Sequence, residues 1–472
     1  MGSGDVMNDD LAEYALDYAE KAGVRYAEVR MEQTKGHTII IKNGNPETAT
    51  LESGQGLSVR VSDGGIGFSS TNVLNKKHVG EVVERAARMA RASGEQNRIS
   101  WSSEDVVEDR WEVKPKIDPA EVSLDEKLEA LGSIEEALKD LDVPMRLYEL
   151  SDETTEKYLT TSEGTRIRSI TPRVSFFYVL TVREGCDTEQ TMLEKGQVGG
   201  WEVMAEWDLP ERTRTEAKML SKLLKEGAKP PSGKVDVVLG PQVTGIAVHE
   251  SCGHPYEADR IAGREAAQAG ESFITPDMLG QVIGSDVVNV IDDPTLPHSY
   301  GYYLYDDEGV KARPRYLIKD GRINEFLHNR ETAAEAGIRS NAAARALDYD
   351  REPIVRMANT YMAPKDYPLE ELIDTVSLGV YMVSYTEWNI DDKRFNQRYV
   401  GKEAYLIDHG EIKGMVRRPA LELTTPSFYG SIDAVGKDVK FFAGDCGKGD
   451  PMQAIPVWMG GPPIRLRGVE LG

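Results

Sequence analysis

His249, Glu250 and His254 form an H-E-x-x-x-H motif within the segment HESCGHPYEAD. Two imidazoles beside a carboxylate suit a catalytic zinc site, because histidines bind the metal and the glutamate can accept a proton from water that the metal activates. The alternative is two ordinary histidines near a solvated glutamate. The chain has only 7 histidines among 472 residues, so a chance match has odds on the order of one in a hundred. The motif therefore predicts a metal site.

The spacing of the two histidines is one residue longer than in the familiar H-E-x-x-H. In an α-helix, residues four apart lie about 40° from one another around the axis, whereas residues five apart lie roughly 140° apart. The helix must therefore end or bulge inside the motif. Gly253 tolerates a turn, and Pro255 disfavours the α region for the residue before it. We expect His254 at the helix exit, turned back toward His249.

The segment before the motif has the pattern of a strand, a turn and a helix. Val235 to Leu239 is apolar and β-branched, Gly240-Pro241 interrupts it, and Val243 to Val248 is a compact apolar run. The histidines are expected on the C-terminal half of a buried helix.

A catalytic zinc usually takes three protein ligands, and two cysteines are candidates for the third. Cys252 follows His249 by three residues, about 60° away on a helix surface. Cys446 lies in FFAGDCGKGDP, where small residues let a thiolate approach a buried metal. Either could instead be a buried free cysteine. Spacing alone does not choose between them.

Several segments after Val235 resemble the TldD/PmbA metallopeptidase family, and within it the TldD-type catalytic subunit. They occur in the family's order: HESCGHPYEAD, DDEGVKARP, MANTYMAPKD, EAYLIDHGEI, DCGKGD and PVWMGGPPIRLRGVELG. The first hundred or so residues also fit the family's smaller N-terminal domain.

This resemblance implies a zinc-dependent peptidase in which His249, His254 and Cys446 bind Zn²⁺ and Glu250 is the general base. It also implies a dimer, either with a PmbA- or TldE-like partner or with a second copy, enclosing a chamber that admits unfolded peptides. The implied role is peptide maturation or degradation in the cytoplasm.

Two segments depart from the family pattern. Family members often have a glycine-rich loop where this chain has the bulky and charged Ser384 to Tyr399, and Asp450-Pro451 follows the C-G-K-G segment. Substrate specificity is therefore expected to differ if the first loop lines the substrate path.

Composition excludes several classes of protein. The formal net charge is −23 and the pI about 4.9, so the chain repels phosphate backbones and direct nucleic-acid binding is not expected. The sequence contains no stretch of about eighteen apolar residues, so we expect no membrane span. Its acidic start differs from the basic and then apolar layout of a secretory signal. Three cysteines are too few for a disulfide framework, which suits a reducing cytosol.

The pattern of elements predicts an α+β fold with three domains. A small N-terminal α/β module is expected in residues 1–100, a middle antiparallel α+β module in 110–228, and a large strand-rich domain with a curled sheet or barrel and the motif helix in 234–472. Ser93 to Ser103 reads as a linker, and Ser123-x-x-Glu126 as a capping box.

Within the first two modules the polarity pattern splits the strands into short pieces. They are expected at Tyr26–Glu32, His37–Lys42, Thr48–Leu51, Gly56–Val61, Met145–Leu150, Thr155–Thr161, Thr165–Ile170 and Val174–Arg183.

Two rival functions use the same residues. In one, the zinc is structural and the chain is a non-catalytic subunit of a peptide-binding complex. In the other, it is a zinc amidohydrolase acting on small amides.

Among the remaining polar residues, His298 and His328 are expected to be surface or satisfied histidines. Three others are expected either to contact the ligand imidazoles or to pack the helix exit: Tyr256, Glu257 and Asp259.

Overall fold

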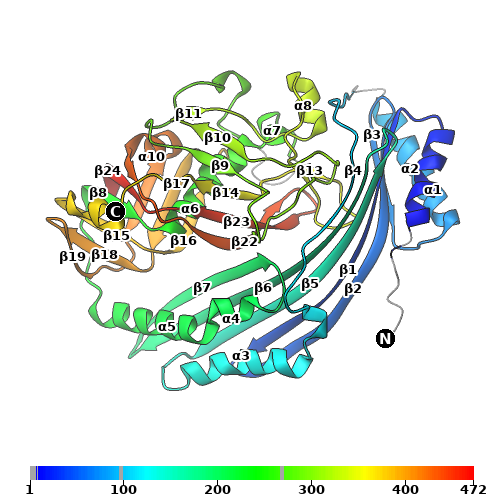
Figure 1. Cartoon of the computed structure of the whole chain (residues 1–472). Coiled ribbons are helices and arrows are strands. Elements are labelled where there is room, and N and C mark those ends of the chain that lie inside the picture. The colour runs from blue at the N-terminus through cyan, green and yellow to red at the C-terminus, as the bar shows by residue number, and fades with distance from the viewer. Residues whose placement is uncertain (1–6, 8, 95–98, 266–270) are drawn as a thin grey trace.

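One long curved sheet forms a wall against which the rest of the molecule lies (Figure 1). A computed structural model describes residue 7 and residues 9–94, 99–265 and 271–472. The strand order is β3-β2-β1-β5-β6-β4, with β7 also pairing β6. The strands are β1 (Tyr26–Lys42), β2 (Asn45–Ser62), β3 (Ile66–Thr71), β4 (Glu108–Glu112), β5 (Met145–Thr161), β6 (Arg166–Glu184) and β7 (Asp187–Val198).

The strands of this curved sheet are longer than the sequence pattern predicts. Tyr26–Glu32 and His37–Lys42, expected as two strands, are one strand, β1; β2, β5 and β6 likewise join pieces expected to be separate. The split was wrong because β1 is paired on both sides across the polar residues 33–36, with Gln33 opposite Gln55 of β2 and Glu156 of β5. Pairing on both sides satisfies the backbone whatever the local polarity.

Helices cover one face of the curved sheet. They are α1 (Asp9–Lys21), α2 (Lys76–Gly94), α3 (Leu124–Leu138), α4 (Val203–Trp207) and α5 (Leu209–Glu226), and α3 begins at the expected capping box of Ser123 and Glu126. Val29 and Met31 of β1 join the core formed with α1 and α2, and Ile39 and Ile41 join the core formed with α3 and α5. Odd-numbered positions thus face the helices at both ends of β1.

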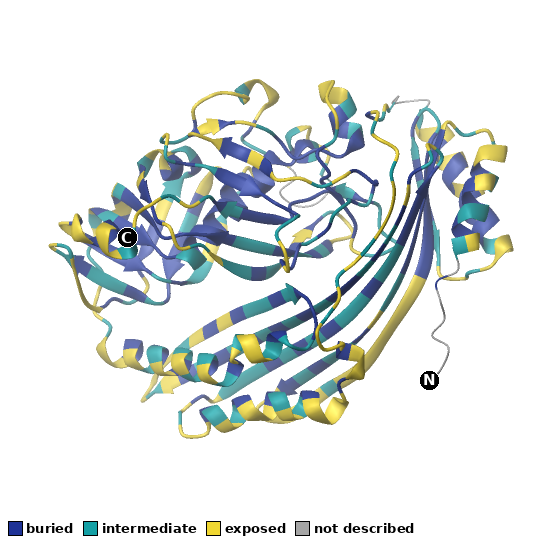
Figure 2. Cartoon of the chain, in the orientation of Figure 1, coloured by how far each residue is buried: buried dark blue, intermediate teal, exposed yellow. Residues whose placement is uncertain are grey.

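The opposite face of β1 is charged where it meets the C-terminal part of the chain. Glu28, Arg30 and Glu32 are buried. The Arg30 guanidinium donates to the backbone oxygen of Asp348 at 2.8 Å, and nearby on β2 the Arg60 guanidinium lies 2.6 Å from Glu308. Ion pairs and hydrogen bonds therefore join the curved sheet to the C-terminal part, and Figure 2 shows buried residues alternating along the strands.

The predicted division into domains at 1–100, 110–228 and 234–472 stays a prediction. Strand β1 of the first predicted module pairs with β5 of the second, so these two modules share one sheet. Part of the expected linker, residues 95–98, lies outside the described residues.

The C-terminal part is strand-rich, as predicted, and its described sheets are open. One sheet has the order β16-β17-β20-β24-β8-β15-β18-β19 with β21 on β24, a second β11-β10-β9-β14-β23-β22, and β12 pairs β13. The strands are β8 (Gly233–Leu239), β9 (Val290–Asp292), β10 (Arg315–Lys319), β11 (Arg322–Ile323), β12 (Ala344–Arg345), β13 (Ile354–Val355), β14 (Asn359–Met362), β15 (Leu378–Met382), β16 (Tyr385–Ile390), β17 (Asn396–Gly401), β18 (Ala404–Asp408), β19 (Glu411–Met415), β20 (Ala420–Thr424), β21 (Ile432–Val435), β22 (Lys440–Lys448), β23 (Gln453–Gly461) and β24 (Ile464–Leu471).

In the described residues of this part, the sheets are accompanied by short α-helices: α6 (Pro241–Val248), α7 (Ala258–Ile261), α8 (Arg330–Ala336), α9 (Leu369–Asp374) and α10 (Thr425–Ser431). None of the helices in the described part of the chain is long and apolar enough to cross a membrane.

Candidate metal centre

The motif follows a buried strand and a buried helix, as the sequence predicts. Strand β8 pairs with β15 and β24, and α6 begins directly after Gly240 and is buried from Val243 onward. Helix α6 packs closely on β23, because a Cβ added at Gly245 would lie 2.9 Å from the backbone nitrogen of Gly460. This close approach fixes where the motif begins relative to the neighbouring strands.

The five-residue spacing is accommodated by a π-helical turn. Residues His249–Gly253 form this turn, and the backbone N–H of His254 donates to the carbonyl of His249 five residues earlier. The wider turn returns His254 to the face of His249, and the two ring centroids lie 5.0 Å apart. The predicted bulge inside the motif is confirmed, and such single π turns recur at functional sites.

The expected role of the two residues flanking His254 was wrong. His254 keeps α-helical angles, with φ −61° and ψ −47°, although Pro255 follows it. Pro255 instead lies in the first turn of a short 3₁₀ helix, where no N–H is required. Gly253 is also α-helical, and a Cβ there would lie 1.8 Å from the sulfur of Met357. The glycine therefore provides space for packing.

The structure brings His249 and His254 together with Cys446. One ligand atom from each lies within 4.8 Å of the others, and the Cys446 sulfur is 3.3 Å from His254 Nε2. Cys446 comes from β22, which pairs with β23. Cys252 is fully buried in the apolar core and is not part of this group.

The charges at the site favour a thiolate next to an imidazolium. Burial would raise the pKa of Cys446, but the imidazoles of His254 and His249 hold that pKa well below its ordinary range. Burial would lower the pKa of His254, but the charges of Cys446 and Glu257 raise it above the ordinary imidazole value. A thiolate is the form of cysteine that binds metals.

Glu257 orients His254 from the side away from Cys446. Its carboxylate lies 3.2 Å from His254 Nδ1, while His254 Nε2 faces the thiol. Burial would raise the pKa of Glu257, but Lys448, 3.2 Å away, and His254 hold it well below its ordinary range. Of the two other residues considered with Glu257, Asp259 binds Lys448 and Tyr256 packs on Phe326.

The Cys446 backbone is fixed by a buried guanidinium. Arg356 donates to the carbonyl oxygen of Cys446 and, at 2.7 Å, to that of Gln453 on the paired strand β23. Because both strands are tied to one rigid side chain, the thiol is held at its place beside the histidines.

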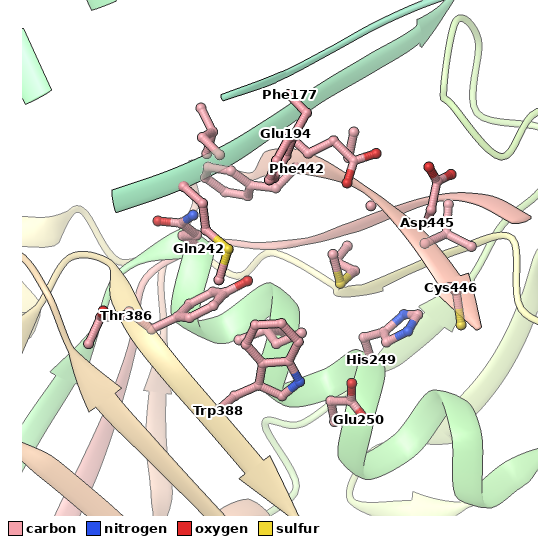
Figure 3. A pocket seen from close by; sticks show the side chains of 18 of the residues that line it. Phe177, Glu194, Gln242, His249, Glu250, Thr386, Trp388, Phe442, Asp445 and Cys446 are labelled. Carbon is pink, nitrogen blue, oxygen red and sulfur yellow. The ribbon is translucent and has the colours of Figure 1, made fainter. Parts of the chain in front are cut away.

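A cavity of about 330 Å³ opens beside this group (Figure 3). His249, Glu250 and Cys446 lie along one side of it in Figure 3, with Trp388 and Phe442 on other sides. Five of the described strands contribute residues to its wall, and three of the five pair with a single neighbour: β7, β16 and β22. Its apolar lining is Phe177, Met192, Leu193, Ile246, Tyr385, Trp388, Phe442, Ala443, Val457 and Met459.

Four charged residues of the cavity were missed by the sequence interpretation: Glu194, Arg394, Lys402 and Asp445. Arg394 forms an ion pair with Glu250, and Glu194 and Asp445 line the wall. Burial and then the charge of Asp445 raise the pKa of Glu194 to about 8. The only signal for Arg394 was the unusual composition of Ser384 to Tyr399, whose Tyr385, Thr386, Trp388 and Arg394 line the cavity.

The other singled-out residues lie elsewhere. His328 is buried with Nδ1 3.1 Å from the Thr332 hydroxyl, and burial lowers its pKa to about 4. His298 Nδ1 lies 3.4 Å from the carbonyl of Val198. Asp450 and Pro451 lie between β22 and β23 and are exposed.

Three family models match along the chain. Residues 27–90 match PmbA/TldA metallopeptidase domain 1, residues 117–225 match the central domain, and residues 232–472 match the C-terminal domain. The chain belongs to the PmbA/TldD metallopeptidase family.

Relatives of known name agree with this assignment. A metalloprotease of Methanocaldococcus jannaschii is 30% identical over 447 residues, which cover 93% of this chain and 95% of the relative. A protein of Saccharolobus solfataricus named as a zinc metalloprotease TldD homolog is 25% identical over 96% of this chain and 98% of its own length. TldE from Thermococcus kodakarensis shares the fold, with a TM-score of 0.77 at 18% identity over 98% of this chain and 100% of that structure.

Proposed function

We propose that this chain is a zinc-dependent peptidase that hydrolyses unfolded or short peptides and is the TldD-type subunit of its family. The observation that carries the proposal is the convergence of His249, His254 and Cys446, from segments far apart in the sequence, beside Glu250 at the wall of one cavity.

The donor atoms at this site suit zinc. Two imidazole nitrogens and one thiolate are ligands that zinc prefers, and three protein ligands leave one position open. Cys446 favours its thiolate form, and His249 Nδ1 is buried without a hydrogen-bond partner among the described residues. When bound, zinc would supply a water molecule whose pKa is lowered to about 7. A structural zinc would need a fourth protein ligand, and the group found among the described residues has three.

Glu250 is the residue that moves the proton. Its carboxylate is largely buried at the cavity wall, where it would accept a proton as water adds to the carbonyl carbon. It would then give the proton to the leaving amine as the C–N bond breaks. His249, His254 and Cys446 would hold the metal and would exchange no proton in these steps.

The cavity wall supports a peptide as substrate. Strands β7, β16 and β22 each pair with one neighbour, and an extended chain can add to such a strand through its own backbone. A larger cavity of about 760 Å³ shares Asp445 with the first and lies between the curved sheet and the C-terminal part. An unfolded chain offers free backbone groups to such surfaces, whereas a folded protein has already paired its own.

The remaining parts of the proposal concern assembly and location. The fold shared with TldE supports a PmbA- or TldE-like partner, with a second copy of this chain as the other choice. We assign the protein to the cytoplasm, and we expect neither nucleic acid nor membrane as a partner.

The test is metal analysis combined with digestion of an unstructured peptide, with and without a partner subunit. We expect zinc in the purified protein, loss of turnover on chelation, and recovery on adding zinc back. Glu250→Gln should keep its zinc and lose turnover by about 10²- to 10⁴-fold, the usual contribution of a general base. A protein without zinc, or one that cleaves no peptide with any partner, would contradict the proposal.

A further inference from the structure

The turn between β16 and β17 is built to present Arg394. The Asp391 carboxylate accepts the backbone N–H groups of Phe395 at 2.8 Å and Asn396 at 3.0 Å. The backbone N–H of Arg394 donates to the Asp391 carbonyl at 2.9 Å. Arg394 itself has φ +64°, a left-handed conformation that costs free energy for a residue with a side chain and persists only where its surroundings determine it.

Neighbouring segments hold this turn from outside the hairpin. The Thr425 hydroxyl donates to the carbonyl of Arg394 at 2.8 Å, and the Thr425 N–H donates to that of Phe395 at 2.8 Å. The ring of Phe395 packs edge-on against the ring of Phe273, with 5.6 Å between the two ring centroids. The direction of the Arg394 side chain is therefore set by tertiary contacts.

The Arg394 side chain reaches the predicted general base. Its Nη1 donates to Oε2 of Glu250, and the two side chains are 15% and 10% exposed. The Arg394 Nε is buried with no hydrogen-bond partner among the described residues. Lys402, another cation at the cavity wall, is engaged by Glu216 and Thr191. The contact with Glu250 is therefore specific to Arg394.

We propose that Arg394 is a positioning residue for Glu250, holding one carboxylate oxygen so that the other faces the reacting water. The inference rests on the proposed peptidase function. A general base must lie within hydrogen-bond reach of the proton that it accepts, and a misplacement of about 1 Å can cost about 10²-fold in rate. A planar guanidinium held by a rigid turn fixes a carboxylate better than a mobile cation would.

The kinetic test compares substitutions at Arg394 with a matched control on the same hairpin. Arg394→Met removes the charge and keeps the length, and Arg394→Lys restores a charge without the planar group. Arg398 of β17 is the control, because it pairs with Glu422 at 2.8 Å on an exposed surface. We expect Arg394→Met to lower kcat on an unstructured peptide by about 10²-fold, with KM and zinc content little changed. Arg394→Lys should recover part of the loss, and Arg398→Met should match the wild type.

A double substitution separates positioning from general damage. In the Glu250→Gln background, Arg394→Met should lower the residual turnover no further, because the base that it positions is already gone. A further loss of similar size there would overturn the proposal. A rise in kcat for Arg394→Met would overturn it too, because it would mean that the ion pair restrains Glu250 in an inactive state.

A crystallographic comparison supplies a readout besides activity. In Arg394→Met, the Glu250 carboxylate should turn away from its present direction or occupy several orientations, while His249, His254 and Cys446 keep their places. An unchanged and well-ordered Glu250 would overturn the inference. If the wild type cleaves no peptide, the proposed function fails, and this comparison still decides whether Arg394 orients Glu250.

Discussion

Cys252 and Cys446 are both buried, and they lie in opposite chemical surroundings. Cys252 belongs to the motif itself and lies in the apolar core, where burial and then the charge of Asp292 raise its pKa well above the ordinary thiol value. Cys446 is 192 residues from His254 in sequence, yet its sulfur lies 3.3 Å from that imidazole, and its pKa is held well below the ordinary value. The neighbours of a thiol, more than its spacing from a histidine, determine whether it suits a metal.

The largest expected difference between the two thiols is in zinc binding. Cys446→Ala should weaken zinc affinity by more than the roughly 10- to 100-fold that losing a group behind a ligand costs, because it removes a ligand itself, and turnover should fall with it. Cys252→Ala should keep zinc and turnover, and should lower the free energy of unfolding by about 1 kcal/mol through lost packing. Metal analysis after dialysis and denaturant unfolding measure both. Retention of zinc by Cys446→Ala together with its loss from Cys252→Ala would reverse the comparison.

A smaller effect is expected from the carboxylate behind His254. Glu257→Gln should weaken zinc affinity by about 10- to 100-fold, because the hydrogen bond that orients the ligand imidazole loses its charge. Asp259→Asn is the control, since Asp259 binds Lys448 and the backbone of Arg260. Chelator competition measures the affinities of both variants. Equal affinities for the two would show that Glu257 does not support the metal site.

A still smaller effect is expected in the pH dependence of zinc affinity, which differs according to which of the two thiols binds the metal. Cys446 has a lowered pKa and is already a thiolate, whereas the raised pKa of His254 leaves a proton that zinc must displace. Zinc affinity should therefore fall as the pH drops through the His254 pKa, by up to about tenfold per pH unit for one proton. A ligand with the raised pKa of Cys252 would add a second proton. A dependence on two protons at pH values above the ordinary imidazole range, where a thiol with the raised pKa of Cys252 would still be protonated, would contradict the assignment of Cys446.

Local sequence predicted the parts of the site that lie within a few residues of one another. The spacing of His249 and His254 required a bulge, and the π-helical turn provides it. Periodicity predicted β8 and α6 as well, and the family resemblance pointed to Cys446. The spacing alone left Cys252 equally plausible, because the contact between β22 and the motif depends on pairing and packing far along the chain.

Other features depend on tertiary structure and left little trace in the sequence. The ion pair of Arg394 with Glu250 joins residues 144 positions apart, and no local pattern indicates it. The sequence pattern also did not indicate the full length of β1. It predicted a break at residues 33–36, but these residues are paired with strands on both sides. Long-range pairing overrides local polarity in such strands.

X-ray absorption at the zinc edge of the purified protein tests the central claim most directly. The structure predicts one sulfur at about 2.3 Å and two imidazole nitrogens at about 2.0 Å, with a light atom in the remaining position. The sulfur signal should persist in Cys252→Ala and should be absent from any zinc that Cys446→Ala retains. A zinc without sulfur, with two sulfurs, or with a sulfur lost in Cys252→Ala would contradict the account.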